Sequence, residues 1–178
     1  DAKAAYFLTI DNGTQSIRAL VFDQRGQLLA KSKVDIEPYT SPQPGWAEQD
    51  ADYFWDSLCA ACQQLWPLLE IPKSAIKAVS ITSQRATVVP VGHDHQPLAP
   101  AISWLDQRRV TSKPNMGPLL TPLLKLVKVM PLVADFHSQA EANWWAQNNP
   151  QLWQKLHKLL LLSGYHTLRM TGQYHDAI

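Results

Sequence analysis

TIDNGTQSIRALVFD, residues 9–23, decides how the chain begins to fold, because it joins two apolar alternating runs through a short polar segment. Asn-Gly between such runs is the strongest short-range signal for a β-hairpin. The sequence therefore predicts strands over residues 6–11 and 17–23, connected by a turn at Asn12-Gly13. A second turn at 24–26 leads to a third strand over 27–36, so the chain opens with an antiparallel meander.

A helix and two further strands follow the meander. Asp50 is a favourable N-cap, and it predicts a helix that runs to about Trp66. The β-branched run at 76–83 has the character of a central strand, whereas Pro90 weakens the strand predicted over 86–91. Three hairpin-connected strands, a helix and a returning strand are typical of a ribonuclease H-like α/β layer.

The second half of the chain changes to loops and helices. The stretch 118–133 is apolar, but its prolines and lysines interrupt it too often for a bilayer span, and it predicts a loop followed by a buried helix. Further segments are predicted as a loop at 111–118 and as helices around 138–147, 150–158 and 159–170. Gly172 is expected to end the last helix.

Composition limits the partners. At 178 residues the chain is expected to form one domain, complete or incomplete. Its formal net charge of +1 lacks the excess of positive charge that binds nucleic acid or an anionic membrane. Small molecules are the favoured partners. No charged and apolar leader precedes the first strand and the chain starts at Asp1, which predicts a trimmed cytoplasmic protein.

Cys59 and Cys62 form a C-x-x-C pair that invites a redox or zinc interpretation. Helical spacing instead places Cys62 on one stripe with Phe54 and Leu58, where a free cysteine acts as a small apolar residue. The sequence has two cysteines in all, so no second pair completes a zinc site. The pair is predicted to be structural.

The first turn carries more polar groups than a hairpin needs. Thr14, Gln15 and Ser16 follow the glycine, and such side chains together with converging backbone N–H groups form an anion-binding nest. Asp11 fits a phosphate site if a hydrated Mg²⁺ lies between the carboxylate and the phosphate. Spacing alone leaves two interpretations open, an ordinary polar turn and a phosphate site.

Four stretches in order carry a family resemblance. D-N-G-T-Q-S-x-R followed by V-F-D resembles the first phosphate motif of the actin-like ATPases. PGWAEQD at 44–50, ITSQRATVVPV at 81–91 and PAISWLDQRR at 100–109 narrow the resemblance to the FGGY carbohydrate kinases, which include glycerol kinase, xylulokinase and ribulokinase. The chain departs from the family pattern at Met170, which stands in a leucine place, and at Ser163-Gly164, where many members have Lys-Asp.

The resemblance implies a fold and an activity. The expected fold is an α/β, ribonuclease H-like domain of the actin-like ATPase kind, with a mixed five-stranded sheet flanked by helices. Residues 1–178 would form a partial N-terminal kinase domain that lacks the C-terminal nucleotide-binding domain. The expected reaction is ATP-dependent phosphorylation of a sugar or polyol hydroxyl, with ATP and Mg²⁺ as cofactors.

The resemblance also assigns residues. Asp11 would hold Mg²⁺ through water, and the family's general base, an aspartate, is expected beyond residue 178. The implied phosphate-binding residues are Gly13, Thr14, Gln15, Ser16 and Arg18. The implied substrate-binding residues are Gln84, Arg85, Trp104 and Asp106.

Ala86 is the departure that bears on the substrate. Glycerol kinases carry there a glutamate that binds a substrate hydroxyl, and a methyl group cannot accept a hydrogen bond. A pentulose such as xylulose or ribulose, or a longer polyol, is therefore favoured over glycerol. Trp46 and Glu48 are interpreted as loop packing and as helix-start electrostatics, and none of the six histidines is given a role.

Two alternatives remain at this point. A non-catalytic, actin-like nucleotide-binding or partner-docking module would keep the turn without sugar chemistry. A ribonuclease H-like nuclease would need several clustered carboxylates around two metals, and only Asp11 is an obvious candidate. We also expect the isolated chain to lack useful kinase activity and to expose apolar surface that allows it to form a homo-oligomer.

Overall fold

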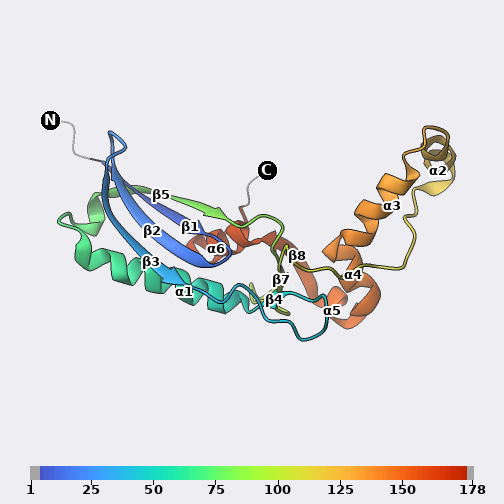
Figure 1. The fold of residues 1–178 in the computed structure, drawn as a ribbon, viewed down its shortest axis with the longest axis horizontal. Coiled ribbons are helices and arrows are strands. Elements are labelled where there is room, and N and C mark those ends of the chain that lie inside the picture. The colour runs from blue at the N-terminus through green and yellow to red at the C-terminus, as the bar shows by residue number, and fades with distance from the viewer. Residues whose placement is uncertain (1–4, 176–178) are drawn as a thin grey trace.

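Two sheets build the molecule. The computed structural model describes residues 5–175, which fold into a mixed sheet and a second, smaller antiparallel sheet, each of four strands. The first sheet lies at one end of an elongated molecule, the second sheet lies in the middle, and a helical arm projects from the other end (Figure 1). The predicted α/β, ribonuclease H-like class is confirmed, as the relatives described below also show.

The first sheet has the strand order β3-β2-β1-β5. Its strands are β1 (Tyr6–Asn12), β2 (Ser16–Asp23), β3 (Leu28–Asp35) and β5 (Ile76–Ser83). β1, β2 and β3 form the predicted antiparallel meander, and β5 returns to pair with β1 in parallel. In the described residues β5 is an edge strand with mostly exposed side chains, so its prediction as a central strand is wrong.

The first turn lies two residues later than predicted. Gly13 donates its N–H to the Ser16 carbonyl at 3.0 Å, so Thr14 and Gln15 are the central residues. Neither Asn12 nor Gly13 has the positive φ that an Asn-Gly type I′ turn requires. Asn12 extends β1 because its side chain is completely buried on the core face of the sheet.

The main core lies between the first sheet and two helices. α1 (Ala51–Leu65) and α6 (Leu162–Thr171) pack on the sheet face that carries Ile10 and Ile17, and α1 contributes Phe54, which has no exposed surface. Figure 1 shows α1 running along that face. At the start of α1, the Asp50 carboxylate accepts from the Asp52 N–H at 2.7 Å, as an N-cap should.

The cysteines belong to this packing. Both thiols are free, and Cys62 is partly buried against the core. Burial, and then the neighbouring Cys59, raise the pKa of the Cys62 thiol to about 11, so the thiol stays protonated at neutral pH. The structural interpretation of the C-x-x-C pair is consistent with these contacts.

The second sheet has the order β4-β7-β6-β8 and corrects two predictions. Residues 156–161 form a strand, not the end of the helix predicted over 150–158 and the start of the helix predicted over 159–170, because a short apolar run has no periodicity that separates strand from helix. The strand predicted over 86–91 forms, but in this sheet, so the mixed sheet has four strands rather than the expected five. The strands are β4 (Glu48–Gln49), β6 (Val88–Gly92), β7 (Ala101–Ile102) and β8 (Leu156–Leu161).

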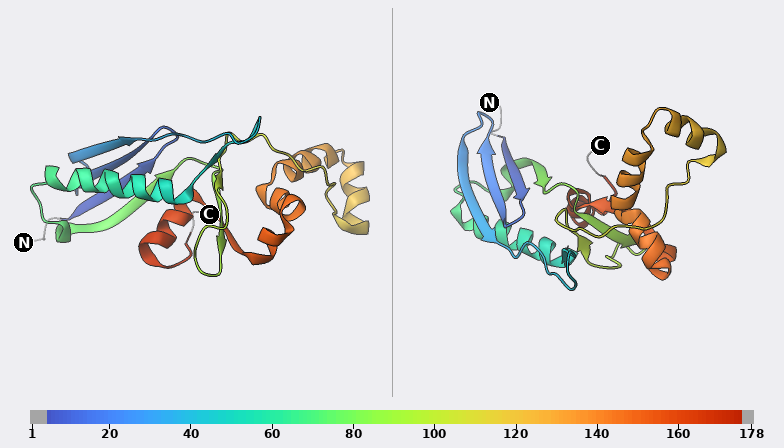
Figure 2. Two further views of the ribbon diagram at one scale, coloured as in Figure 1. Left: turned by 90° about the horizontal axis from the view of Figure 1, so that it is seen from below. Right: turned by 45° about the vertical axis from the view of Figure 1, so that its right-hand side comes forward.

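The helical arm corrects a third prediction. The stretch 118–133 is not a loop and a buried helix, because it forms parts of two helices joined near Lys128, which has φ 58°, and exposes Leu120, Leu123, Leu126, Val127 and Leu132. Both further views show the arm projecting from the rest of the molecule (Figure 2). The helices after the second sheet are α2 (Gly117–Leu126), α3 (Met130–Gln139), α4 (Glu141–Asn148) and α5 (Pro150–Lys155).

Two short 3₁₀ turns complete the fold. They are η1 (Trp66–Leu68), which follows α1 directly, and η2 (Lys73–Ala75), which precedes β5. Across the described range, 5–175, every helix is too short or too polar to cross a lipid bilayer.

Two phenylalanines test this division into core and arm. Phe54→Ala should lower the free energy of unfolding by about 3–5 kcal/mol, because it leaves a cavity between α1 and the sheet. Phe136→Ala should change it by about 0.5 kcal/mol or less, because Phe136 on the arm is 66% exposed. Urea unfolding followed by circular dichroism measures both values. If Phe54→Ala does not fold, Phe54→Leu gives a milder comparison, and equal losses at the two positions would contradict the assignment.

Candidate functional site

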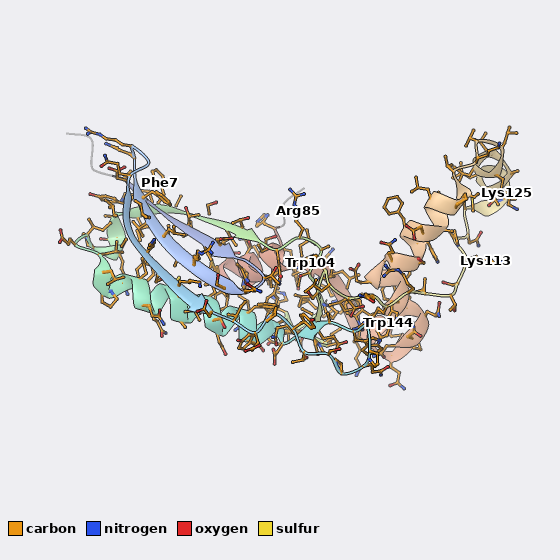
Figure 3. All side chains as sticks on the ribbon, viewed as in Figure 1. Phe7, Arg85, Trp104, Lys113, Lys125 and Trp144 are labelled. Atoms are coloured by element: carbon orange, nitrogen blue, oxygen red, sulfur yellow. The ribbon has the colours of Figure 1, made fainter. Side chains whose placement is uncertain are left out.

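An open cleft lies where the first turn meets the second sheet. Its volume is about 420 Å³, and it is lined by Thr14, Gln84, Arg85, Ala86 and Trp104. Figure 3 shows Arg85 and Trp104 near each other at this end of the first sheet, whereas Phe7 lies at the opposite end. Thr14, from the predicted phosphate turn, therefore shares one cleft with three of the four predicted substrate-binding residues.

The parallel pairing of β1 with β5 positions the Gln84 side of the cleft. The Gln84 N–H donates to the Asn12 carbonyl at 2.9 Å, which continues the ladder past the end of β5. The side-chain amide of Gln84 is buried, and its oxygen and nitrogen have no partner within residues 5–175. Ala86 has φ 52°, a left-handed conformation that costs energy for a residue with a Cβ.

Trp104 forms the opposite wall. Its side chain is 51% exposed, and its indole N–H donates to the Thr14 hydroxyl at 3.3 Å. This bond joins the first turn to the loop after β7, ninety residues away in the sequence. The exposed indole thus presents an apolar surface beside the Arg85 guanidinium and the Gln84 amide.

The first turn leaves backbone donors available. The Gln15 carbonyl accepts from the Ile36 N–H at 3.0 Å, which fixes the turn against the end of β3. Among the hydrogen bonds of the described residues, none uses the backbone N–H groups of Thr14 or Gln15. Gln15 is exposed and Ser16 is buried. Two adjacent free N–H groups in a tight turn can bind an anion.

Asp11 and Arg18 lie beside the cleft rather than in its lining. They are paired across β1 and β2, and the Arg18 guanidinium lies 3.2 Å from the Asp11 carboxylate. Both side chains are partly exposed on the sheet face opposite to Asn12. Asp11 is the residue here that could hold a hydrated cation. In the part of the chain that the structure describes, no cluster of three or more ligating side chains could bind a metal directly.

Asp106 lies outside the cleft lining, and its carboxylate already has partners. It accepts from the Ala47 N–H at 2.7 Å and from Nε and Nη2 of Arg108 at 2.8 and 2.7 Å. Arg108 also pairs with Glu48 at 2.8 Å, and its guanidinium lies over the rings of Trp46 and Trp144, 3.9 and 4.5 Å from their centroids. The structure therefore places the Asp106 carboxylate in a buried ion pair that holds two loops together.

Those two loops are the stretches 44–50 and 100–109. The Ser103 N–H donates to the Ala47 carbonyl at 2.9 Å, and the Gln107 N–H donates to the Gly45 carbonyl at 2.8 Å. The expectation that Trp46 packs is consistent with its contact with Arg108, whereas Glu48 acts through Arg108 rather than at a helix start. These contacts between the two loops set the position of Trp104.

Sequence reasoning missed Asn12 and His166. Both are completely buried, and His166 Nε2 lies 2.8 Å from the Asn12 side-chain oxygen. Burial, and then the charge of Arg169, lower the pKa of His166 to about 4, so its ring is neutral at physiological pH. The available signal was weak: His166 stands on the apolar face of the last predicted helix, where a histidine is usually a core residue.

The fold around this cleft defines a class of protein, the ribonuclease H-like α/β domains of the actin-like ATPase fold. Residues 6–176 match the sequence model of the FGGY family of carbohydrate kinases, N-terminal domain. The chain belongs to this family.

Relatives identified by sequence agree with this family assignment. The chain is 31% identical over 154 residues to a glycerol kinase of Coxiella burnetii, with 85% of this chain and 30% of that protein covered. A glycerol kinase of Acinetobacter baylyi is 42% identical over 105 residues, which cover 58% of this chain and 21% of that protein. The chain thus spans under a third of the length of these relatives.

Solved structures show the same fold. A structure described as a xyloylose kinase from Brucella ovis superimposes with a TM-score of 0.75 at 24% identity, covering 95% of this chain and 35% of that one. A glycerol kinase from Plasmodium falciparum, determined with ADP, superimposes with a TM-score of 0.69 at 21% identity over 95% of this chain and 35% of that one.

The buried histidine predicts how stability changes with pH. The pKa of His166 falls from 6.5 in the unfolded chain to about 4 in the fold, so the unfolded state binds the proton more readily. The stability that this neutral ring contributes is complete above pH 6.5 and is lost as the pH falls toward 4. Between about pH 7.5 and about pH 5 the loss should reach about 2 kcal/mol.

Urea unfolding at the two pH values measures this loss, with His166→Gln as the comparison. The variant lacks the titrating ring, so it should lose less stability than the parent chain over the same interval. Identical losses in both proteins would show that His166 does not carry the effect. His175, exposed near the end of the described residues, gives a control in His175→Gln, which should behave as the parent does.

Proposed function

We propose that this domain supplies the first phosphate-binding turn and much of the sugar site of an ATP-dependent carbohydrate kinase. The kinase would transfer the γ-phosphoryl group of ATP to a hydroxyl of a sugar or polyol. The observation that carries the proposal is the single cleft that Thr14 shares with Gln84, Arg85 and Trp104. A phosphoryl transfer needs its two substrates in contact, and this cleft joins the residues suited to each.

The chemistry of the cleft suits a hydroxylated carbon chain. The buried amide of Gln84 can both donate and accept, and it has no protein partner among the described residues. The exposed guanidinium of Arg85 can donate two parallel hydrogen bonds to neighbouring hydroxyls. Trp104 offers an apolar surface for the C–H side of the substrate.

The turn suits a phosphate chain. The free N–H groups of Thr14 and Gln15, with the Thr14 hydroxyl, would contact phosphate oxygens, and Gly13 and Ser16 frame the turn. Asp11 would hold Mg²⁺ through water, and Arg18, its partner at 3.2 Å, would add positive charge near the phosphates. When bound, Mg²⁺ supplies neutralisation of the phosphate charge. Asp106 would act on the substrate indirectly, since its contacts fix the loop that bears Trp104.

Within the kinase family, the cleft favours a pentulose over glycerol. The Ala86 methyl group lines the cleft, and by the family resemblance it stands where glycerol kinases carry a glutamate, so a short triol would lose an acceptor there. The curated relatives named above are glycerol kinases, whereas three of the similar structures are described as xylulose kinases and one as a glycerol kinase. The local chemistry of Ala86 supports the pentulose.

Asp11 tests the metal role. In the full-length protein, Asp11→Asn should lower kcat by about a hundredfold, because the amide no longer attracts the hydrated cation. The concentration of Mg²⁺ needed for half-maximal rate should rise. A coupled assay of ADP release over a Mg²⁺ series measures both values. Asp56→Asn, on the exposed face of α1 away from the first turn, is the matched control, and a Mg²⁺ dependence unchanged by Asp11→Asn would refute the role.

Arg85 tests the sugar role. Arg85→Ala should raise the KM for the sugar by about tenfold or more, because hydrogen bonds from a charged donor are lost. The KM for ATP should change by about twofold or less. Arg25→Ala, in the turn at the other end of the sheet, should leave both values unchanged. A non-catalytic module would show no sugar-dependent turnover with any of these proteins.

A substrate panel separates the two parts of the proposal. Xylulose and ribulose should give higher kcat/KM values than glycerol in the full-length protein. Ala86→Glu should narrow the difference by restoring an acceptor. A clear preference for glycerol would reject the pentulose assignment while leaving the kinase assignment intact.

A further inference from the structure

Asn12 is the point at which the phosphate turn, the sugar side of the cleft and α6 meet. Its backbone carbonyl accepts from the Gln84 N–H at 2.9 Å. Its side-chain N–H donates to the Gly13 carbonyl at 3.1 Å, and its side-chain oxygen lies 2.8 Å from His166 Nε2. No surface of Asn12 is exposed, so these bonds replace those that water would make.

The hydrogen bonds of Asn12 determine which ring nitrogen of His166 carries the proton. Because the Asn12 amide nitrogen donates to Gly13, its oxygen is left as an acceptor, and His166 Nε2 must carry a proton. His166 Nδ1 is buried without a hydrogen-bond partner among the described residues, which favours its unprotonated form. The ring packs beside Trp55 and Tyr165. The charged groups nearby are Arg169, on the next turn of α6, and its partner Asp52 on α1.

The Gly13 carbonyl governs the direction of a donor in the cleft. In a planar trans peptide the carbonyl of one residue and the N–H of the next point in opposite directions. A Gly13 carbonyl held by the buried Asn12 amide therefore turns the Thr14 N–H away from the core. This is one of the two N–H groups left free for phosphate, and Thr14 lines the cleft.

We propose that His166 is a positioning residue of the phosphate-binding turn. Its Nε2–H holds the Asn12 side-chain oxygen, the Asn12 amide holds the Gly13 carbonyl, and the Thr14 N–H is thereby fixed toward the nucleotide. The role rests on the kinase function proposed above, since it concerns the same turn. His166 touches neither substrate, so it acts through Asn12 alone.

Packing does not explain the contact by itself. An apolar side chain of similar size could fill the space, but it would leave the completely buried Asn12 oxygen without a donor. An unsatisfied buried acceptor is costly, so the amide would rotate to another partner and release the Gly13 carbonyl. His166→Leu should therefore preserve the packing around position 166 but lose the orientation of the first turn.

Two substitutions at His166 test the role in the full-length protein. His166→Leu should lower kcat/KM for ATP by about tenfold, as expected for loss of a buried hydrogen bond, with about twofold or less change in the KM for the sugar. His166→Gln can still donate from its amide and should recover most of the loss. Equal kinetics for His166→Leu and the parent would overturn the proposal, as would equal losses for Leu and Gln.

A matched control separates positioning from stability. Leu168→Ala, also buried on α6, should destabilise the domain without contacting Asn12. Assayed below its unfolding temperature, it should keep the kcat/KM for ATP of the parent. A loss in Leu168→Ala as large as that in His166→Leu would show that His166 acts only through the packing of α6.

A readout without catalysis distinguishes failure of this proposal from failure of the kinase assignment. In protein labelled with ¹⁵N-histidine, His166 should show a protonated Nε2 and an unprotonated Nδ1 at neutral pH, and Asn12→Ala should shift both signals. The opposite tautomer or a charged ring would overturn the positioning role whatever the enzyme does. If no sugar is phosphorylated, Mg·ADP affinity measured by calorimetry replaces the kinetics, with the same order expected among the variants.

Discussion

The parallel pairing of β1 with β5 is the constraint on which the site depends. Parallel strands end at the same edge of a sheet, so the residues that follow them are neighbours however far apart they lie in sequence. Here the pairing runs from Tyr6 opposite Ile76 to Asn12 opposite Ser83, and one more bond joins Asn12 to Gln84. The phosphate turn and the Gln84 turn are thus adjacent before any side chain makes a contact.

The Arg108 cluster supplies the remaining wall. Burying an arginine is costly unless its charge and its donors are matched. Asp106 and Glu48 match the charge and the Nε and Nη2 donors of Arg108, and two tryptophan rings lie against its guanidinium, while Nη1 has no partner among the described residues. Because the same Asp106 carboxylate also accepts from Ala47, the cluster fastens one loop to the other. Trp104 lies on the loop that this cluster holds in place, and its hydrogen bond to Thr14 joins that loop to the first turn. Two independent constraints therefore position the walls of the cleft: the pairing of β1 with β5 and the Arg108 cluster.

The sequence revealed what depends on local pattern. The meander, the Asp50 cap and the boundaries of β5 follow from alternation and capping chemistry, and three of the four residues that the family resemblance assigned to the substrate line one cleft. The first turn was misplaced because the partner of the Asn12 side chain lies 154 residues away, and no local rule includes His166. Asp106 was assigned to the cleft because a motif specifies residue types and not the direction in which a carboxylate points. The strand at 156–161 was taken for helix because apolar runs of that length fit either.

Three features of the cleft are unfavourable for the stability of the protein without a ligand. Ala86 occupies a left-handed backbone conformation, the Gln84 amide is buried without a partner among the described residues, and half of the Trp104 surface is exposed. Each of these lowers stability, so each persists only because the surrounding sheet and the Arg108 cluster leave no alternative. A hydroxylated ligand would supply partners for the Gln84 amide and cover Trp104. These three unfavourable features thus lie together at the place where a substrate would bind, and a ligand that relieved them would bind to groups already in position.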